Sequence, residues 1–276
     1  MNSTKINKIR IQREEIITLI KQGISIPKIS KKLGINKSKI YYHYKKIKGR
    51  KYSLEVLPSN NQVIGEFLGA FAGDGSCYYD KKRGHYTINF HLHAKDDKQY
   101  GLFLQKTIKK NFKKKVRSYS VKNELRLVFY SKKVFEFIEG YLTIEKNKTL
   151  NVSLRWPLNA FSKQFKASFV RGLFDTDGHV RQGGRLALGL ISEQLILQVS
   201  NILKEFEIDN RIYLRKKLPN QHRLYELTIP RRYLATYLKR IGFSNKRKNA
   251  VAEIRTPDPS RKGEEFSGHS VGNAVS

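Results

Sequence analysis

The first fifty residues of the chain alternate short apolar stripes with glycines that end helices. Ile16, Leu19 and Ile20 recur at helical spacing, and they predict an amphipathic helix that ends near Gly23. A second, shorter apolar stripe follows and stops at Gly34. The pattern therefore predicts a small all-α unit at the start of the chain.

A third stripe follows Asn36, a residue that can cap a helix. A short helix, a glycine-containing turn and a basic helix form the helix-turn-helix pattern, and the stretch SIPKISKKLGINKSKIYYHYKKI resembles that family. We therefore predict that residues 1–50 are a helix-turn-helix DNA-binding domain; the alternative is a helical hairpin with a solvated basic face. The side chains that would face the major groove are Lys37, Ser38, Lys39, Tyr42 and His43.

From residue 62 onward the hydrophobic pattern occurs twice. The stretch VIGEFLGAFAGDGS at 63–76 aligns with SFVRGLFDTDGH at 168–179, and matching segments follow both in the same order. Alternating apolar positions predict the strands and helical spacing predicts the helices, so each half reads helix, strand, strand, helix, strand, strand, helix. The predicted fold class is α+β, with two αββαββα halves.

Domain boundaries follow from this repeat. The two halves occupy residues 62–152 and 153–254. Residues 51–61 (KYSLEVLPSNN) are predicted to be a linker, because proline and polar residues interrupt any helix there. Residues 255–276 lack periodicity and are rich in Gly, Ser and Pro, so we expect a disordered tail.

Composition indicates the class of partner. The 276 residues include 55 Lys and Arg against 23 Asp and Glu, a net charge of +32. So basic a surface favours nucleic acid, because phosphates neutralise it and release counterions. The single cysteine, Cys77, excludes a disulfide framework, and no apolar run approaches the ~18 residues of a membrane span. The charged N-terminus lacks the apolar core of a signal peptide, so we expect an intracellular protein, cytoplasmic or, in a eukaryotic host, organellar.

Both copies of the repeated helix carry small residues at a spacing of four. They are Gly65, Gly69 and Gly73 in the first copy and Ser168, Gly172 and Thr176 in the second. Such faces let two helix backbones approach closely, so we expect the helices to pack side by side and end together. Asp74 and Asp177 would then meet. Two nearby carboxylates in a basic protein predict a divalent metal site for phosphodiester chemistry.

The stretches FLGAFAGDG and VRGLFDTDG resemble the two motifs of the LAGLIDADG homing endonucleases in their single-chain form, over about residues 62–254. The resemblance implies two pseudo-symmetric halves that form a DNA-binding saddle, in a monomer that makes metal-dependent double-strand breaks in a long DNA site. It implies Mg²⁺ as cofactor, with Mn²⁺ as a substitute. Asp74 and Asp177 would be catalytic and bind the metal, together with the backbone carbonyls of Gly73 and Thr176.

The two copies also differ. The earlier acid of the motif is Asp175 in the second copy, but Ala72 stands there in the first, which indicates that this acid is not the essential one. The family also has a basic residue near each metal. The repeat matches EKNKTL with FSNKRK, which makes Lys148 and Lys246 the candidates.

Alternation along the predicted strands puts polar and basic residues on one face of each half. In YTINFHLHA, Ile88, Phe90 and Leu92 point inward and Thr87 points outward, and in NRIYLRKK Leu214 points inward. A curved β surface with such side chains can read base edges in the major groove; a solvated sheet face is the alternative. The predicted DNA contacts are Asn89, His91, His93, Lys115, Arg117, Arg126, Arg211, Tyr213, Arg215 and Lys217.

Two other functions stay open on the same fold. One is a DNA-binding transcriptional regulator, because some family members joined to helix-turn-helix units have lost cleavage. Such proteins usually lack the motif acids, whereas both acids are present here. The other is an RNA-splicing maturase that binds its own intron RNA. A ribosomal protein would also be basic, but it would not need paired acids at helix ends.

Overall fold

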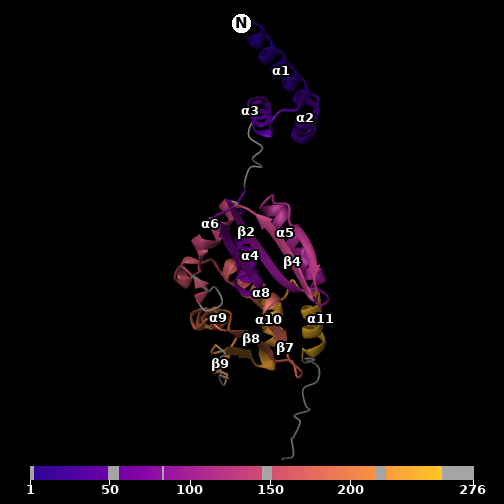
Figure 1. Cartoon of the computed structure of the whole chain (residues 1–276). Coiled ribbons are helices and arrows are strands. Elements are labelled where there is room, and N and C mark those ends of the chain that lie inside the picture. The colour runs from indigo at the N-terminus through magenta and orange to yellow at the C-terminus, as the bar shows by residue number, and fades with distance from the viewer. Residues whose placement is uncertain (1–2, 49–55, 83, 145–150, 216–221, 257–276) are drawn as a thin grey trace, which may run out of the picture. The chain divides into compact units, whose positions relative to one another are not determined.

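The N-terminal unit consists of three helices. In the computed structural model, which describes residues 3–48, 56–82, 84–144, 151–215 and 222–256, the chain divides into Met1–Leu54 and Glu55–Ser276 (Figure 1). The first unit contains α1 (Ser3–Lys21), α2 (Ile26–Leu33) and α3 (Lys37–Lys48). Gly34 ends α2 with a φ of 64°, the left-handed conformation that glycine adopts without strain. Its core consists of Ile16, Leu19, Ile20, Ile29, Ile35 and Ile40.

The second unit begins with a half that contains a four-stranded antiparallel sheet. Its elements are α4 (Asn61–Asp74), β1 (Gly75–Asp80), β2 (His85–His93), α5 (Lys98–Asn111), β3 (Arg117–Val121), β4 (Glu124–Tyr130) and α6 (Lys132–Tyr141). The strand order is β1-β2-β4-β3. Asn60 caps α4, because its side-chain oxygen accepts hydrogen bonds from the backbone N–H groups of Gln62 and Val63.

The other half has the same order of helices and strands, with one helix added at its end. Its elements are α8 (Lys163–Thr176), β7 (Gly178–Val180), β8 (Leu186–Leu190), α9 (Glu193–Glu205), β9 (Arg211–Leu214), β10 (Tyr225–Ile229), α10 (Leu234–Arg240) and α11 (Lys246–Arg255). The strand order is β7-β8-β10-β9, so the second and fourth strands of this half are again the two central ones and the first and third are the edges. Between the halves, β5 (Leu142–Thr143) pairs with β6 (Ser153–Leu154), and two short helical turns are η1 (Leu158–Ala160) and η2 (Arg231–Tyr233).

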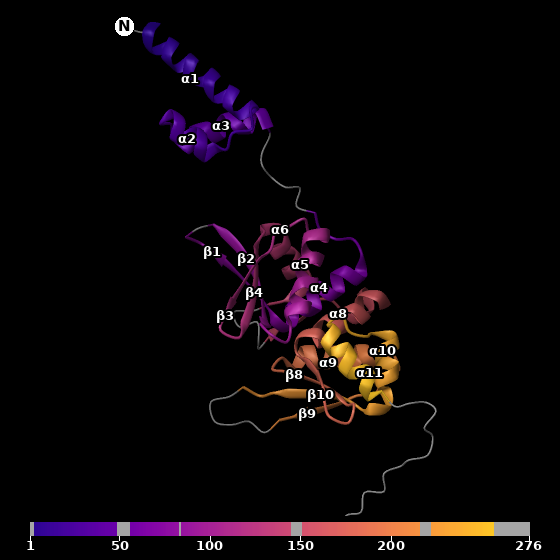
Figure 2. The ribbon, with the colours of Figure 1, turned by 90° about the vertical axis from the view of Figure 1, so that its right-hand side faces the viewer.

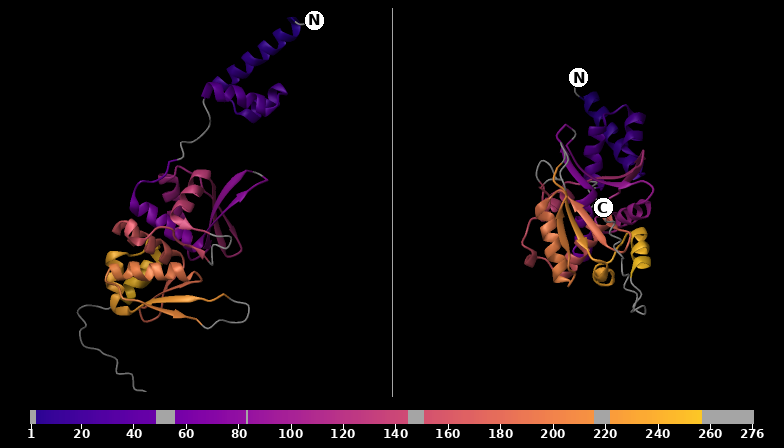
Figure 3. Two further views of the ribbon diagram at one scale, coloured as in Figure 1. Left: turned by 90° about the vertical axis from the view of Figure 1, so that its left-hand side faces the viewer. Right: turned by 90° about the horizontal axis from the view of Figure 1, so that it is seen from below.

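The second unit has its sheets on one side and its helices on the other. Figures 2 and 3 show both sheets facing the same way, with α4 and α8 side by side behind them. One hydrophobic core runs through both halves, and it includes Phe71 and Phe90 of the first half with Phe169 and Phe174 of the second. In the described parts of the chain, no helix is long and apolar enough to cross a membrane.

The register of the strands decides which residues of the two halves are equivalent. Gly75 pairs with Phe90 in the first sheet, and Gly178 pairs with Leu188 in the second. These glycines follow the two motif acids, so Phe90 and Leu188 occupy the same place in their sheets. A shift of one residue would turn every side chain to the opposite face.

Two strand residues do not lie where alternation places them. Thr87 belongs to the outward face but is only 3% exposed; the much larger residues Tyr78 and Tyr130 pair with it on the two neighbouring strands. Leu214, predicted to point inward, is 56% exposed, because it is the last residue of an edge strand. The residues that alternation predicts to be buried on β2 are buried: Ile88, Phe90 and Leu92.

The predicted linker falls partly, and the predicted tail mostly, outside the described residues. Residues 56–60 form neither helix nor strand, and α4 then begins at Asn61. Residues 51–55 of the predicted linker and 257–276 of the predicted tail lie outside the described ranges.

Candidate active site and nucleic-acid interface

The backbones of α4 and α8 approach each other at three glycines. A Cβ atom built on any of them would overlap a backbone carbonyl oxygen of the facing helix. The glycines are Gly65, Gly69 and Gly172, which face the carbonyl oxygens of Phe165, Phe169 and Glu66, respectively. Only glycine leaves room for this approach, so the small residues spaced by four bring the two helices together.

The two motif acids lie at the ends of this helix pair. Asp74 is the last residue of α4, and Asp177 is the C-cap of α8. A Cβ atom built on Gly73 would lie 2.8 Å from Asp177 Oδ2 and would overlap Thr176 Oγ1. The carboxylate of Asp177 therefore lies against the residue next to Asp74, and the ends of the two motifs meet.

Lys248 of α11 holds the C-terminal end of α8. Its ammonium group donates to the carbonyl oxygens of Phe174 at 3.0 Å, Thr176 at 2.8 Å and Gly178 at 2.5 Å. The carbonyls of Phe174 and Thr176 carry the partial negative charge of the end of α8, and Gly178 begins β7, so together they stabilise a cation that is only 6% exposed. Burial lowers the pKa of Lys248, and three nearby aspartates oppose that shift.

Lys248 is a lysine at the end of the second motif that the sequence pattern does not single out, and it follows the predicted Lys246 by two residues; the role of Lys246 stays a prediction. Lys246 is the first residue of α11 and is exposed, whereas Lys248 points into the protein. Helical spacing could have predicted that Lys248 is buried, because it precedes the fully buried Ala252 by four residues and therefore lies on the same face of α11. Lys148, the other predicted lysine, lies outside the described residues.

Asp175 links α8 to the start of α11. Its carboxylate accepts from the backbone N–H groups of Ser244 and Asn245, both at 3.0 Å. Asn245, 1% exposed, donates its amide to Asp97 Oδ1 of the first half at 3.0 Å and to the Asp175 carbonyl at 3.3 Å. Burial raises the pKa of Asp175, and the two backbone N–H groups oppose the rise. Asp175 therefore anchors α11 and, through it, Lys248.

The residues at the motif ends fit a divalent metal by the chemistry of their donors. Asp74 and Asp177 carry carboxylates, and Gly73 and Thr176 carry backbone carbonyls, which are the hard oxygen ligands that Mg²⁺, Mn²⁺ and Ca²⁺ prefer. Among the residues that the structure describes, no three His, Cys, Asp or Glu side chains group as metal ligands. A metal at this place would thus need carbonyl, water or phosphate oxygens to complete its shell.

On the outer face of the first sheet, Glu124 joins two predicted DNA contacts. Its carboxylate accepts from Arg126 Nε at 2.8 Å and contacts Nδ1 of His91. His91 Nε2 lies 3.0 Å from Ser76 Oγ, which accepts from Asn89 Nδ2 at 3.3 Å. Arg126 and then His91 hold the pKa of Glu124 below its usual value. The structure thus brings three predicted residues together around an acid that the sequence did not single out.

On the outer face of the second sheet, Glu226 joins two arginines. Its Oε1 lies 2.6 Å from Arg181 Nη2, and its Oε2 accepts from Arg215 Nε at 2.6 Å. The glutamate side chain is 8% exposed, whereas those of the arginines are 38% and 50% exposed. Two further predicted contacts, Arg211 and Tyr213, are exposed and line a hollow of about 250 Å³ beside them.

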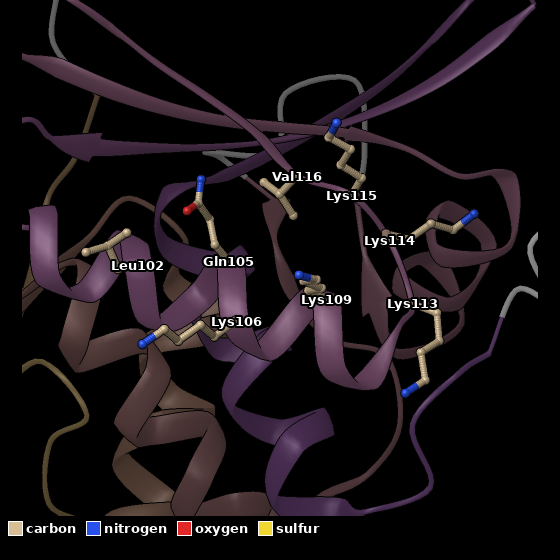
Figure 4. Close-up of a pocket in the computed structure, with 8 residues that line it drawn as sticks. All are labelled: Leu102, Gln105, Lys106, Lys109, Lys113, Lys114, Lys115 and Val116. Atoms are coloured by element: carbon tan, nitrogen blue, oxygen red, sulfur yellow. The ribbon is translucent and has the colours of Figure 1, made fainter.

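The remaining predicted sheet contacts lie apart from these clusters. His93 is exposed at the end of β2 and its Nδ1 lies 3.3 Å from Asp96 Oδ2, and Arg117 is exposed on β3. Lys115 precedes β3 and lines a pocket of about 650 Å³ between α5 and residues 113–116 (Figure 4). Four more lysines line this pocket: Lys106, Lys109, Lys113 and Lys114. Lys217 lies outside the described residues.

In the N-terminal unit the five predicted contacts all lie on α3. Lys37, Ser38, Lys39 and Tyr42 are exposed and His43 is half-buried. Together with Arg13 of α1 and Lys46, three of them line a hollow of about 210 Å³, and Lys46 Nζ lies 4.7 Å from the centre of the Tyr42 ring. Burial, and then the cations Arg13, Lys46 and Lys39, lower the pKa of His43.

Comparisons with known proteins agree on the fold. Residues 164–242 match the family described as LAGLIDADG-like domain. The homing endonuclease I-DmoI, solved in complex with DNA and Ca, superposes with a TM-score of 0.55 and 20% identity over 70% of this chain and 98% of that chain. I-DmoI in complex with DNA and Mn gives a TM-score of 0.52. The protein therefore has a mixed α/β fold with antiparallel sheets that is similar to the fold of I-DmoI.

Two curated relatives come from Methanocaldococcus jannaschii. "Uncharacterized protein MJ0398" is 24% identical over 277 aligned residues, which cover 88% of this chain and 94% of that protein. A "Probable translation initiation factor IF-2" is 31% identical over 124 residues, which cover 44% of this chain and 11% of that factor. The chain thus matches only a small segment of the factor.

Proposed function

We propose that the protein is a site-specific homing endonuclease that makes divalent-metal-dependent double-strand breaks in DNA. The observation that carries the proposal is the contact between the motif ends: glycine-mediated packing of α4 on α8 sets the carboxylate of Asp177 against Gly73, the residue before Asp74. The similarity to I-DmoI, whose structures contain DNA with Ca or Mn, supports the same reading.

In this proposal Asp74 and Asp177 hold Mg²⁺, or Mn²⁺ in its place, with the carbonyl oxygens of Gly73 and Thr176. The bound metal supplies Lewis-acid stabilisation of the charge that develops on the phosphate. Lys248 fixes the Thr176 carbonyl from inside the protein, at 2.8 Å, and so sets the direction of its oxygen. Asp175 and Asn245 keep α11, and hence Lys248, in register with the end of α8.

Recognition of a long site is assigned to the two sheets and the N-terminal helices. A single chain with two such halves would act as a monomer and form a saddle over the duplex. The basic and aromatic residues of the outer sheet faces would contact base edges and phosphates. The N-terminal unit would act as a helix-turn-helix domain and extend the contacted site through α3, which presents Lys37, Lys39 and Tyr42 to solvent.

The test is cleavage of a supercoiled plasmid library that carries a randomised insert, with the full chain and either Mg²⁺ or EDTA. We expect Mg²⁺-dependent linear products whose ends share one sequence family. Asp74→Asn and Asp177→Asn should each reduce double-strand cleavage by at least about 1,000-fold, because a lost metal ligand removes several kcal/mol of transition-state stabilisation. Asp209→Asn, which changes an exposed aspartate of the second half, is the matched control.

Three outcomes would reject the proposal. A protein that binds selected DNA but never cuts it in Mg²⁺ or Mn²⁺ would be the DNA-binding regulator. Wild-type cleavage by either motif mutant would show that the acids at the motif ends are not the site. Tight, selective binding of an RNA intron in place of DNA would indicate the maturase.

A further inference from the structure

An acidic side chain lies on the outer face of the second sheet. Glu226 projects from β10 between Gly189 of β8 and Tyr213 of β9, and its side chain is 8% exposed. A carboxylate at this place would repel the phosphates of a bound duplex. A buried carboxylate is also costly unless partners compensate its desolvation. Two arginines supply this compensation for Glu226.

Two arginines reach Glu226 from opposite edges of the sheet. Arg215 follows β9 and donates its Nε to Oε2 at 2.6 Å, and its Nη2 also contacts that oxygen. Arg181 follows β7 at the other edge, and its Nη2 lies 2.6 Å from Oε1. The Nε of Arg181 donates to Nε2 of His179 at 3.3 Å. An ion pair with Glu226 and at least one directional hydrogen bond thus fix the position of each arginine.

The contacts leave part of each guanidinium group available to a ligand. Arg215 uses one edge, Nε and Nη2, on the glutamate, and its side chain remains 50% exposed. Arg181 remains 38% exposed. On β8, Gly189 pairs with Glu226 and carries no side chain that could cover either arginine, whereas Ala187 is fully buried. A guanidinium group fixed in this way has lost its rotamer freedom before a ligand binds, so binding costs less entropy.

The charge of Glu226 indicates which part of DNA the arginines suit. The glutamate offsets positive charge, which weakens the attraction for phosphates that drives non-specific binding. Recognition of a base depends instead on the direction of the donors, and a well-oriented arginine pairs bidentately with O6 and N7 of guanine. The arrangement therefore favours reading of base edges over contact with the phosphate backbone.

We propose that Glu226 is a specificity-determining residue, which positions Arg181 and Arg215 to read guanine in the major groove. This inference rests on the proposed function, because it requires that the second sheet faces DNA. Glu226 touches the arginines and not the base, so it is a positioning residue. Its removal changes which sequences are bound more than how tightly DNA is bound.

The test is selection of bound duplexes from a pool with a randomised segment, in EDTA so that binding is read without cleavage. Glu226→Gln keeps the size of the side chain and removes its charge. Glu207→Gln is the matched control, because Glu207 pairs with Arg240 at 2.7 Å but is exposed and lies outside the sheets. For Glu226→Gln we expect the preference for guanine to fall about 5-fold to 100-fold at one or two base pairs. Binding to unselected DNA should stay equal or become tighter, and Glu207→Gln should match the wild type.

An unchanged base preference in Glu226→Gln would overturn the inference, and so would a loss spread evenly over the whole site. A wild-type protein that selects no sequence would overturn the proposed function instead, so the two failures are distinguishable. If Glu226→Gln does not fold, Arg215→Lys carries the test, because that side chain is half exposed and lysine keeps its charge. Arg215→Lys should lose preference at one or two base pairs. A uniform loss of affinity with a shallower salt dependence would make Arg215 a phosphate contact and refute the assignment.

Discussion

The two halves of the second unit share an order of helices and strands but place their charges differently. On β4 of the first sheet Arg126 pairs with His91, and on β10 of the second sheet Glu226 pairs with Gly189. These positions are equivalent, because the residues before His91 and Gly189 pair with the glycine that follows each motif acid. An arginine in one half thus corresponds to a glutamate in the other.

A similar contrast holds behind the motif acids. The first half has Ala72 where the second half has Asp175, which is fully buried and held by the start of α11. The side chain of Glu124 is 31% exposed, whereas that of Glu226 is 8% exposed. The second half therefore buries its acids more deeply and holds them with contacts inside the protein. A duplicated fold can specialise in this way, and we expect its target site to be non-palindromic.

The largest effect is expected at the buried lysine of the second half. Lys248→Met leaves three carbonyl oxygens without their donor and removes a buried cation near Asp97, Asp175 and Asp177, so the free energy of unfolding should fall by about 3 kcal/mol. Lys246→Met, at an exposed position of the same helix, should change it by less than about 0.5 kcal/mol. Urea denaturation of both variants measures the difference. Equal effects would show that α11 does not brace the motif end.

A smaller effect is expected at the acid that the first half lacks. Asp175→Asn replaces one carboxylate oxygen by an NH₂ group that faces a backbone N–H donor, of Ser244 or Asn245. We expect a loss of about 1–2 kcal/mol in the free energy of unfolding, the cost of a buried donor without an acceptor. Asp209→Asn makes the same substitution at an exposed position, where the amide oxygen can still accept from the Tyr233 hydroxyl, and serves as control. Indistinguishable urea midpoints for the two variants would contradict an anchoring role for Asp175.

Substitution of the two sheet glutamates, Glu226 and Glu124, should change the free energy of unfolding by less than the two variants above. Glu226→Gln weakens two charged hydrogen bonds at a buried side chain, and we expect a loss of about 1 kcal/mol. Glu124→Gln acts on a more exposed cluster and should cost less than about 0.5 kcal/mol. Thermal and urea unfolding of the two single variants and the double variant compare the sites. A larger loss for Glu124→Gln would reverse the ranking of the two halves.

The sequence predicts the frame of the protein well because that frame depends on local patterns. Alternation buries Ile88, Phe90 and Leu92, and small residues at a spacing of four let α4 and α8 touch. Leu214 does not follow this pattern. It is the last residue of an edge strand, and alternation does not predict whether other residues pack over the end of such a strand. The elements themselves therefore follow from short stretches of the chain.

The partners within the site were harder to predict, because they are distant in the sequence. Lys248 meets the end of α8 about seventy residues away, and only the packing of α11 makes that contact. Repeat alignment points to Lys246 and passes over Lys248, since it compares residues by order and not by the face they occupy. The sequence pattern does not single out Glu124 and Glu226. Basic and polar side chains are the expected DNA contacts, whereas the two glutamates contact the arginines and not, by expectation, the DNA.

The smallest expected effect is the pH dependence of the stability that Glu124 of the first sheet contributes. Arg126 and then His91 hold the pKa of Glu124 below its usual value of 4.5. A carboxyl group whose pKa is depressed by folding contributes stability above its unfolded pKa, and that contribution is lost as pH falls through the folded pKa. The stability difference between wild type and Glu124→Gln should thus shrink as the pH falls below about pH 4. Urea unfolding at a series of pH values measures it. A difference that persists in acid would mean that Glu124 acts by packing, and the contrast between an exposed, charge-dependent cluster and a buried one would lose its basis.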